Sequence, residues 1–144
     1  SAGIEPLYGI HLVRTVMDGM ALSSLHPAFA QHAETHGLAL PALQRELEQS
    51  ASIQHLTQLP ASLRQLFITA HDVSPAHHVR MQAAFQRHND SGVSKTINLP
   101  PSARLQDVAE AFQLAHRLGC KGLTVFRSGS RNGQVLSCSQ QQSC

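Results

Sequence analysis

The chain has 144 residues, of which 42% are hydrophobic and only 4% aromatic, and its net charge is +2. This length allows about one domain with a single core, which must be built mainly from aliphatic side chains. The small positive charge comes from scattered arginines rather than a basic stripe, so the composition argues against nucleic-acid binding. Three cysteines and the lack of a long apolar run argue against a disulfide scaffold and a membrane span, and we expect a cytoplasmic protein.

The first half of the sequence predicts a hairpin followed by short helices. Strands are expected near residues 8–16 and 20–25, because Asp18 and Gly19 lie between two apolar runs and favour a tight turn. One amphipathic helix is predicted from Pro27 to a stop at Gly37, and a second begins at Pro41 and continues to residue 49.

The second half predicts a helix and then a strand. Ser74 is a typical N-cap and Pro75 suits the first helical position, so we expect a helix from residue 75 to about residue 88. Residues 93–99 alternate as a strand does, with one polar face of small side chains and one largely apolar face. The polar face holds Ser94, Thr96 and Asn98, and the other holds Val93, Lys95, Ile97 and Leu99.

A helical stripe over residues 105–118 ends at Gly119, and the string LTVF at 123–126 predicts another strand. Strand, helix and strand together form a βαβ unit with a right-handed crossover. Because a parallel pair needs further strands and covering helices, the predicted fold class is α/β and the unit must belong to a larger sheet. The segment from Ser128 to the end is rich in Ser, Gln and Gly, and we expect it to be a flexible tail that holds Cys138 and Cys144.

Several residues invite a chemical role. His32 and His36 have a spacing that suits metal ligands, but HAETH does not match the H-E-x-x-H motif, and we interpret both as surface histidines. Lys95 is either an edge residue that extends toward solvent or a group directed at an anion. Arg127 and Arg131 follow the last strand, where α/β folds bind ligands, although solvated arginines are common there.

The three thiols have different settings. Cys120, between the helix stop and the last strand, is expected to be a small buried hydrophobe. Cys138 and Cys144 could exchange between dithiol and disulfide, or they could be idle thiols on a mobile end.

Three strings in the sequence resemble the C-terminal end of the large subunit of ribonucleotide reductase, in its adenosylcobalamin-dependent class. They occur in the order of that family and are SAGIEP (1–6), HVRMQAAFQRHNDSGVSKTINLP (78–100) and LGCKGLTVFRSGSR (118–131). The resemblance implies that the βαβ unit supplies the last strands of a ten-stranded α/β barrel, with residues 1–127 in the barrel domain and 128–144 as the tail. Reductases that import their radical carry a tyrosine pair in the last strand, whereas LTVF has none.

The resemblance also implies roles for residues and partners. Cys138 and Cys144 would form the dithiol that reduces the active-site disulfide, with thioredoxin or glutaredoxin as the reductant, although five residues separate them, one more than is common. The residues expected near the nucleotide substrate or the cofactor are Gly3, Ile4, Glu5, Pro6, Ser94, Lys95 and Thr96.

In the family, the radical cysteine and the phosphate-binding loop lie upstream of the GIEP string. The sequence therefore resembles either the downstream piece of a divided reductase or a piece cut from a longer reductase at that point, and we expect it to be inactive without an upstream chain. The rival interpretation is a self-standing α/β interaction or regulatory module that has no activity.

Overall fold

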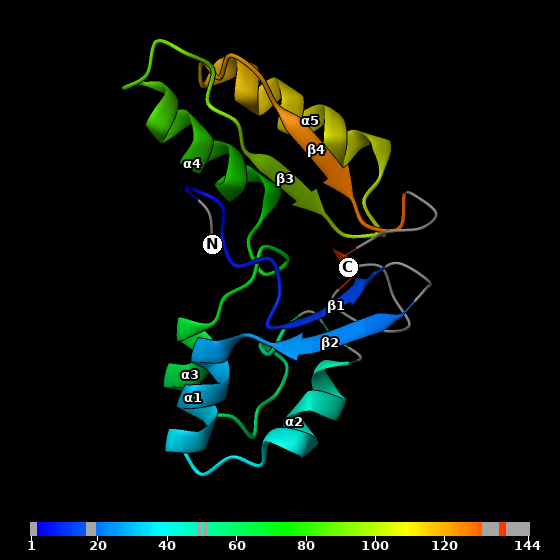
Figure 1. Cartoon of the computed structure of the whole chain (residues 1–144). Coiled ribbons are helices and arrows are strands. Elements are labelled where there is room, and N and C mark those ends of the chain that lie inside the picture. Colours follow the sequence, from blue (N-terminus) through cyan, green and yellow to red (C-terminus); the bar gives the residue numbers. More distant parts are fainter. Residues whose placement is uncertain (1–2, 17–19, 49, 51, 131–135, 138–144) are drawn as a thin grey trace.

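The computed structural model describes residues 3–16, 20–48, 50, 52–130 and 136–137, which form two halves (Figure 1). One half holds a small antiparallel sheet with three short helices, and the other holds a parallel strand pair with two longer helices. The described strands thus form two separate sheets of mixed α/β architecture, and they do not close into a barrel.

The antiparallel sheet begins with β1 (His11–Thr15) and β2 (Ala21–Leu25), which pair in the register His11 with Leu25 and Thr15 with Ala21. The predicted hairpin is confirmed, while its turn residues Asp18 and Gly19 lie outside the described residues. A short strand, β5 (Leu136–Ser137), pairs with the other edge of β1. The sequence predicted no strand in that segment, because two residues give no readable alternation.

Three helices pack beside this sheet: α1 (Pro27–Thr35), α2 (Leu40–Leu47) and α3 (Ala61–Leu66). Proline in the first turn opens α1 and α2, and Gly37 has a φ of 67° just past α1, as predicted. Helix α3 was not predicted, since six residues are too few for a clear helical period.

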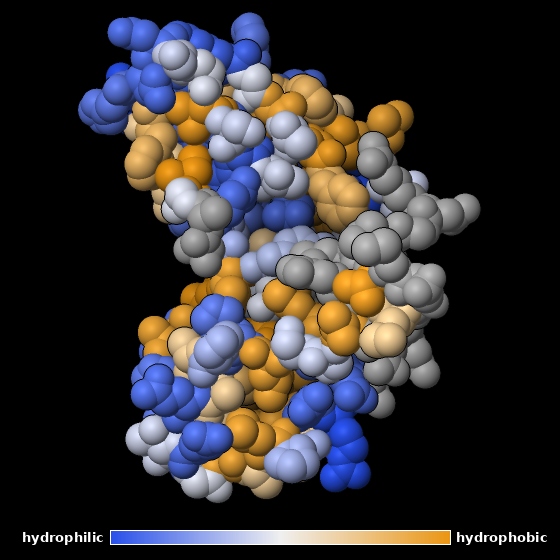
Figure 2. All heavy atoms as spheres, viewed as in Figure 1, coloured by the Kyte–Doolittle hydropathy of each residue, from blue (hydrophilic) through white to orange (hydrophobic). Residues whose placement is uncertain are grey.

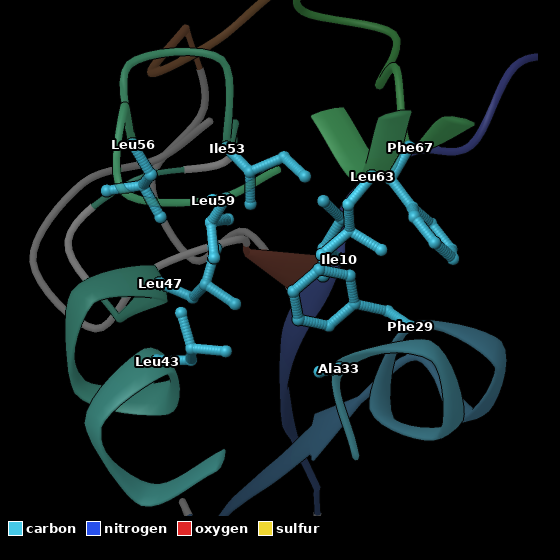
Figure 3. Packing of buried hydrophobic residues seen from close by; sticks show 10 residues of the cluster. All are labelled: Ile10, Phe29, Ala33, Leu43, Leu47, Ile53, Leu56, Leu59, Leu63 and Phe67. Carbon is cyan, nitrogen blue, oxygen red and sulfur yellow. The ribbon is translucent and has the colours of Figure 1, made fainter. Parts of the chain in front are cut away.

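Side chains from the three helices and from segments outside them form a mainly aliphatic core (Figure 3). Phe29 of α1 meets Phe67, which follows α3, edge to face with ring centroids 5.2 Å apart. The cluster comprises Ile10, Phe29, Ala33, Leu43, Leu47, Ile53, Leu56, Leu59, Leu63 and Phe67.

The other half contains α4 (Pro75–Gln86), β3 (Thr96–Leu99), α5 (Leu105–Arg117) and β4 (Thr124–Arg127). Strands β3 and β4 are parallel, with Thr96 opposite Thr124 and Leu99 opposite Arg127, so the predicted βαβ unit is confirmed. Ser74 caps α4 by accepting a hydrogen bond from the backbone N–H of His77, as expected. Gly119 has a φ of 76° after α5.

Both helices of this half cover the same face of the strand pair. Ile97 and Leu99 of β3 form a buried cluster with Val79 of α4 and with Ala111 and Ala115 of α5. The predicted alternation of residues 93–99 thus directs its apolar face at the helices, although regular strand pairing begins only at Thr96. The backbone of Val93 is bound by two glutamines of α4 instead, which explains the later start.

The folded body continues past Arg127. Ser128 is buried and its backbone N–H donates to the carbonyl of Leu99, which extends the β3–β4 ladder by one step. Beyond it, residues 131–135 and 138–144 lie outside the described residues, so the predicted flexible tail stays a prediction. Among the helices that the structure describes, none has the length and apolarity needed to cross a membrane.

Candidate functional site

Glu5 and Lys95 meet at the centre of the candidate site. The Nζ atom of Lys95 lies 2.7 Å from Oε2 of Glu5, and the backbone N–H of Thr96 donates to Oε1 of the same carboxylate at 2.7 Å. The Lys95 side chain is 1% exposed, whereas that of Glu5 is 33% exposed. One carboxylate therefore neutralises a buried cation and also binds the first residue of β3.

This geometry decides between the two interpretations of Lys95. Its side chain does not extend toward solvent; it is directed at an anion, and that anion is the carboxylate of Glu5. The second hydrogen bond of Nζ, at 3.4 Å, goes to the carbonyl of Thr96. Both described partners of the ammonium group are therefore protein oxygen atoms.

The structure brings the predicted site residues together from two distant strings. Gly3, Ile4 and Glu5 line a cavity of about 370 Å³ with Ser94, and Glu5 is bonded to Lys95 and Thr96. The same N-terminal segment, now with Pro6, also lines a second cavity of about 440 Å³ together with Lys95. A role of these residues beside substrate or cofactor stays a prediction.

His78 of α4 lines the larger cavity and is 1% exposed. Its Nε2 atom lies 2.9 Å from the carbonyl oxygen of Ala70 and must carry the proton of that hydrogen bond, because a carbonyl oxygen can only accept. Burial lowers the pKa of His78, which favours the neutral ring. Nδ1 is then an acceptor, and it has no hydrogen-bond partner among the described residues.

Two buried glutamines of α4 were missed by the sequence analysis. Nε2 of Gln82 donates to the carbonyls of Val93 and Gly122, both at 2.8 Å, and so ties together the segments that lead into β3 and β4. Gln86 donates to the carbonyls of Asn89 and Ser91 in the turn that follows the helix. The signal was present in the sequence, because residues 82 and 86 share the helical face of Val79 and Ala83.

The remaining candidates have ordinary surroundings or lie outside the described residues. Nδ1 of His36 is bonded to the carbonyl of His32, whose ring packs against Phe67 at a centroid distance of 5.7 Å. Within the described ranges, no group of three or more His, Cys, Asp or Glu side chains could hold a metal ion. Cys120 packs half-buried against the βαβ core, and burial raises the pKa of its thiol.

Arg127 is exposed at the end of β4, and its Nη1 atom donates to the carbonyl of Ala103 at 3.4 Å. Arg131, Cys138 and Cys144 lie outside the described residues, so their predicted roles stay predictions.

The comparison with protein families decides where this chain belongs. Residues 1–126 match the family model described as the barrel domain of ribonucleotide reductase. The chain belongs to the ribonucleotide reductase family. This match favours the reductase interpretation over a self-standing module, and it covers both strings that the Glu5–Lys95 ion pair joins.

Curated relatives in this reductase family include two named vitamin B12-dependent ribonucleoside-diphosphate reductase. The relative from Thermoplasma acidophilum is 38% identical over 95% of this chain and 18% of its own length. The relative from Mycobacterium tuberculosis strain H37Rv is 42% identical over 95% of this chain and 19% of its own length. The chain thus spans about a fifth of the curated relatives that it matches.

Among solved structures, the alpha subunit of the class Id ribonucleotide reductase of Actinobacillus ureae has a similar fold. The TM-score is 0.67 at 21% identity, over 87% of this chain and 22% of that subunit. The fold of this chain is thus similar to that of part of a reductase alpha subunit.

Proposed function

We propose that this chain forms the C-terminal part of a ribonucleotide reductase barrel and, together with the polypeptide that carries the radical cysteine, reduces ribonucleotides to deoxyribonucleotides. The observation that carries this proposal is the barrel-domain match over residues 1–126. The contact between Glu5 and Lys95 supports it, because two separated strings of the resemblance form one site. In the complete enzyme, β3 and β4 would be the last strands of the ten-stranded barrel.

We propose adenosylcobalamin as the cofactor of the complete enzyme, where it supplies the radical that starts the reaction. Vitamin B12 dependence is part of the names of the relatives described above, and β4 reads TVFR, without the tyrosine pair of reductases that import a radical. The cavities beside Glu5, of about 440 and 370 Å³, suit a drug-sized group rather than a whole corrin. The described residues therefore do not fit as the main cobalamin site, and the rest of the enzyme would hold the cofactor.

We further propose that Cys138 and Cys144 carry reducing equivalents. A thiolate of one cysteine attacks the active-site disulfide, which releases one active-site thiolate and forms a mixed disulfide. The second cysteine then attacks the mixed disulfide, so that Cys138 and Cys144 become oxidised and both active-site thiols are restored. Thioredoxin or glutaredoxin returns two electrons to the new disulfide and completes the cycle.

One reconstitution experiment tests the activity. The chain is mixed with the reductase polypeptide of the same organism that holds the rest of the barrel, together with adenosylcobalamin, a ribonucleoside diphosphate or triphosphate, and a reductant. Deoxyribonucleotide is expected from the mixture and from neither part alone. A folded monomer that does not bind the other polypeptide and adds no activity to it would contradict the proposal and support the interaction module.

The same assay, run with two reductants, tests the tail. Cys138→Ser and Cys144→Ser are each expected to abolish turnover with thioredoxin, because a protein reductant needs an accessible dithiol. Turnover with a small dithiol should survive, because such a reagent reaches the buried disulfide directly. Full activity of both variants with thioredoxin would exclude the shuttle role, whereas loss with both reductants would point to damaged assembly.

A further inference from the structure

A groove runs along α4 beside the N-terminal segment of the chain. The cavities of about 440 and 370 Å³ share Gly3, Ile4, Glu5 and Phe85 in their walls, so they lie next to each other, and we call the two together the groove. The larger cavity extends to Val73, before α4, and the smaller one extends past the end of the helix to His88 and Asn89. The groove therefore follows a helix of 12 residues, which corresponds to about 18 Å.

The helix wall of this groove is apolar and exposed. Met81 and Phe85 lie one turn apart on α4 and are 40% and 51% exposed. The opposite face of α4 is already buried, since Val79 packs in the core of the βαβ unit and Ala83 is 1% exposed. Large apolar side chains that line a concave surface are typical of a binding site.

Three polar residues, Glu5, Lys95 and His78, also line the larger cavity, and one of their groups lacks a partner. Lys95 and Glu5 neutralise each other there, so neither charge needs a ligand. Nδ1 of His78, in contrast, is a buried acceptor that no described residue satisfies. Because a buried acceptor without a partner destabilises the structure, the occupant of the groove should bring a hydrogen-bond donor.

We propose that this groove receives a segment of the remaining reductase polypeptide, which packs an apolar side chain against Met81 and Phe85 and donates a hydrogen bond to Nδ1 of His78. A polypeptide carries both requirements, since apolar side chains alternate with backbone N–H donors along one segment. This chain matches only about a fifth of the length of the curated relatives. The other four fifths of such a reductase could supply the segment. The proposal rests on the proposed function and adds the place where the two parts join.

Two phenylalanines of almost equal exposure allow a matched test. Phe85 lines the groove and is 51% exposed, while Phe112 on α5 is 50% exposed and lies outside both cavities. Affinity for the reductase polypeptide of the same organism that holds the rest of the barrel is measured by calorimetry for Phe85→Ser and Phe112→Ser. Phe85→Ser is expected to weaken binding at least about tenfold, as the loss of a buried aromatic anchor does, whereas Phe112→Ser should leave it within about twofold.

A spectroscopic readout tests the hydrogen bond separately. In the chain labelled with nitrogen-15, the Nδ1 signal of His78 should move from the position of an unbonded ring nitrogen to that of a hydrogen-bond acceptor when the other polypeptide is added. Equal affinities of the two serine variants, or an unchanged Nδ1 signal in the complex, would overturn the groove proposal while the reductase function stands. Failure of the unmodified chain to bind at all would overturn both.

The experiment also distinguishes other occupants of the groove. If Phe85→Ser abolished self-association of the chain but did not affect binding of the other polypeptide, the groove would be an interface between copies, and the proposal would be wrong. Saturable binding of indole at Phe85 that persists in the complex would likewise show that the groove remains open and contradict the proposal.

Discussion

Glu5 and Lys95 lie 90 positions apart and form an ion pair whose two members are buried to different extents. A buried ammonium group that loses its carboxylate partner cannot easily be hydrated, whereas a carboxylate with a third of its surface exposed can. The pair is therefore asymmetric, and Lys95 depends on Glu5 more than Glu5 depends on Lys95.

We expect Glu5→Gln to lower the free energy of unfolding by about 3 kcal/mol, because it leaves the Lys95 ammonium group buried without a counterion. Lys95→Met should cost only about 1 kcal/mol, since Glu5 keeps its hydrogen bond to Thr96 and part of its hydration. Urea unfolding of dilute protein measures both losses, with exposed Glu34→Gln as the control. A larger loss for Lys95→Met than for Glu5→Gln would show that the asymmetry is wrong.

At the scale of elements, α4 organises the parallel strand pair. It packs on β3 and α5 through Val79, and its Gln82 binds the backbone segments that precede both strands. Each strand of the pair has only four residues, so its position depends on these connections as much as on its own ladder. Helix α4 thus sets where β3 and β4 begin.

We expect Gln82→Leu to lower the free energy of unfolding by about 2 kcal/mol, because the carbonyls of Val93 and Gly122 both lose the amide that binds them. The substitution should accelerate amide hydrogen exchange in β3 and β4 more than in α1, which lies in the other half. Gln113→Leu, at an exposed position of α5, is the control and should change neither quantity. Uniform acceleration over both halves would contradict a local role of Gln82.

At the scale of the whole molecule, apolar surface remains exposed on both halves, as one face shows in Figure 2. The parallel sheet has only two described strands, and parallel sheets normally bury both edges and both faces. The large hydrophobic side chains that are at least 40% exposed include Met20, Leu22, Leu66, Ile68, Met81, Phe85, Leu105 and Phe112.

We therefore expect the isolated chain to bind a hydrophobic dye or to self-associate, because open strand edges and apolar patches favour association. Addition of the polypeptide that holds the rest of the barrel should reduce the dye signal. Fluorescence titration and light scattering measure the two effects. A cooperative thermal transition of a monomer with little dye binding would count against the proposal that another polypeptide supplies the rest of the barrel.

Local signals in the sequence were sufficient to predict several elements. The Asp-Gly pair indicated the hairpin, Ser74 and Pro75 indicated the start of α4, and Gly119 indicated the end of α5. Alternation in residues 93–99 gave the two faces of β3, because side-chain period follows directly from backbone geometry. Glu5 and Lys95 both lie in strings that resemble the reductase family, and this resemblance predicted them as site residues.

The contacts between these parts became visible in the folded chain and not in the sequence. No local pattern predicts that Glu5 neutralises Lys95 or that Gln82 binds two segments at once. The unsatisfied acceptor of His78 is equally absent from any local pattern. The short α3 and β5 were likewise invisible, since their few residues are fixed by packing and strand pairing rather than by intrinsic preference. Contacts between distant residues depend on how the chain folds back on itself, and a single sequence contains no direct record of that path.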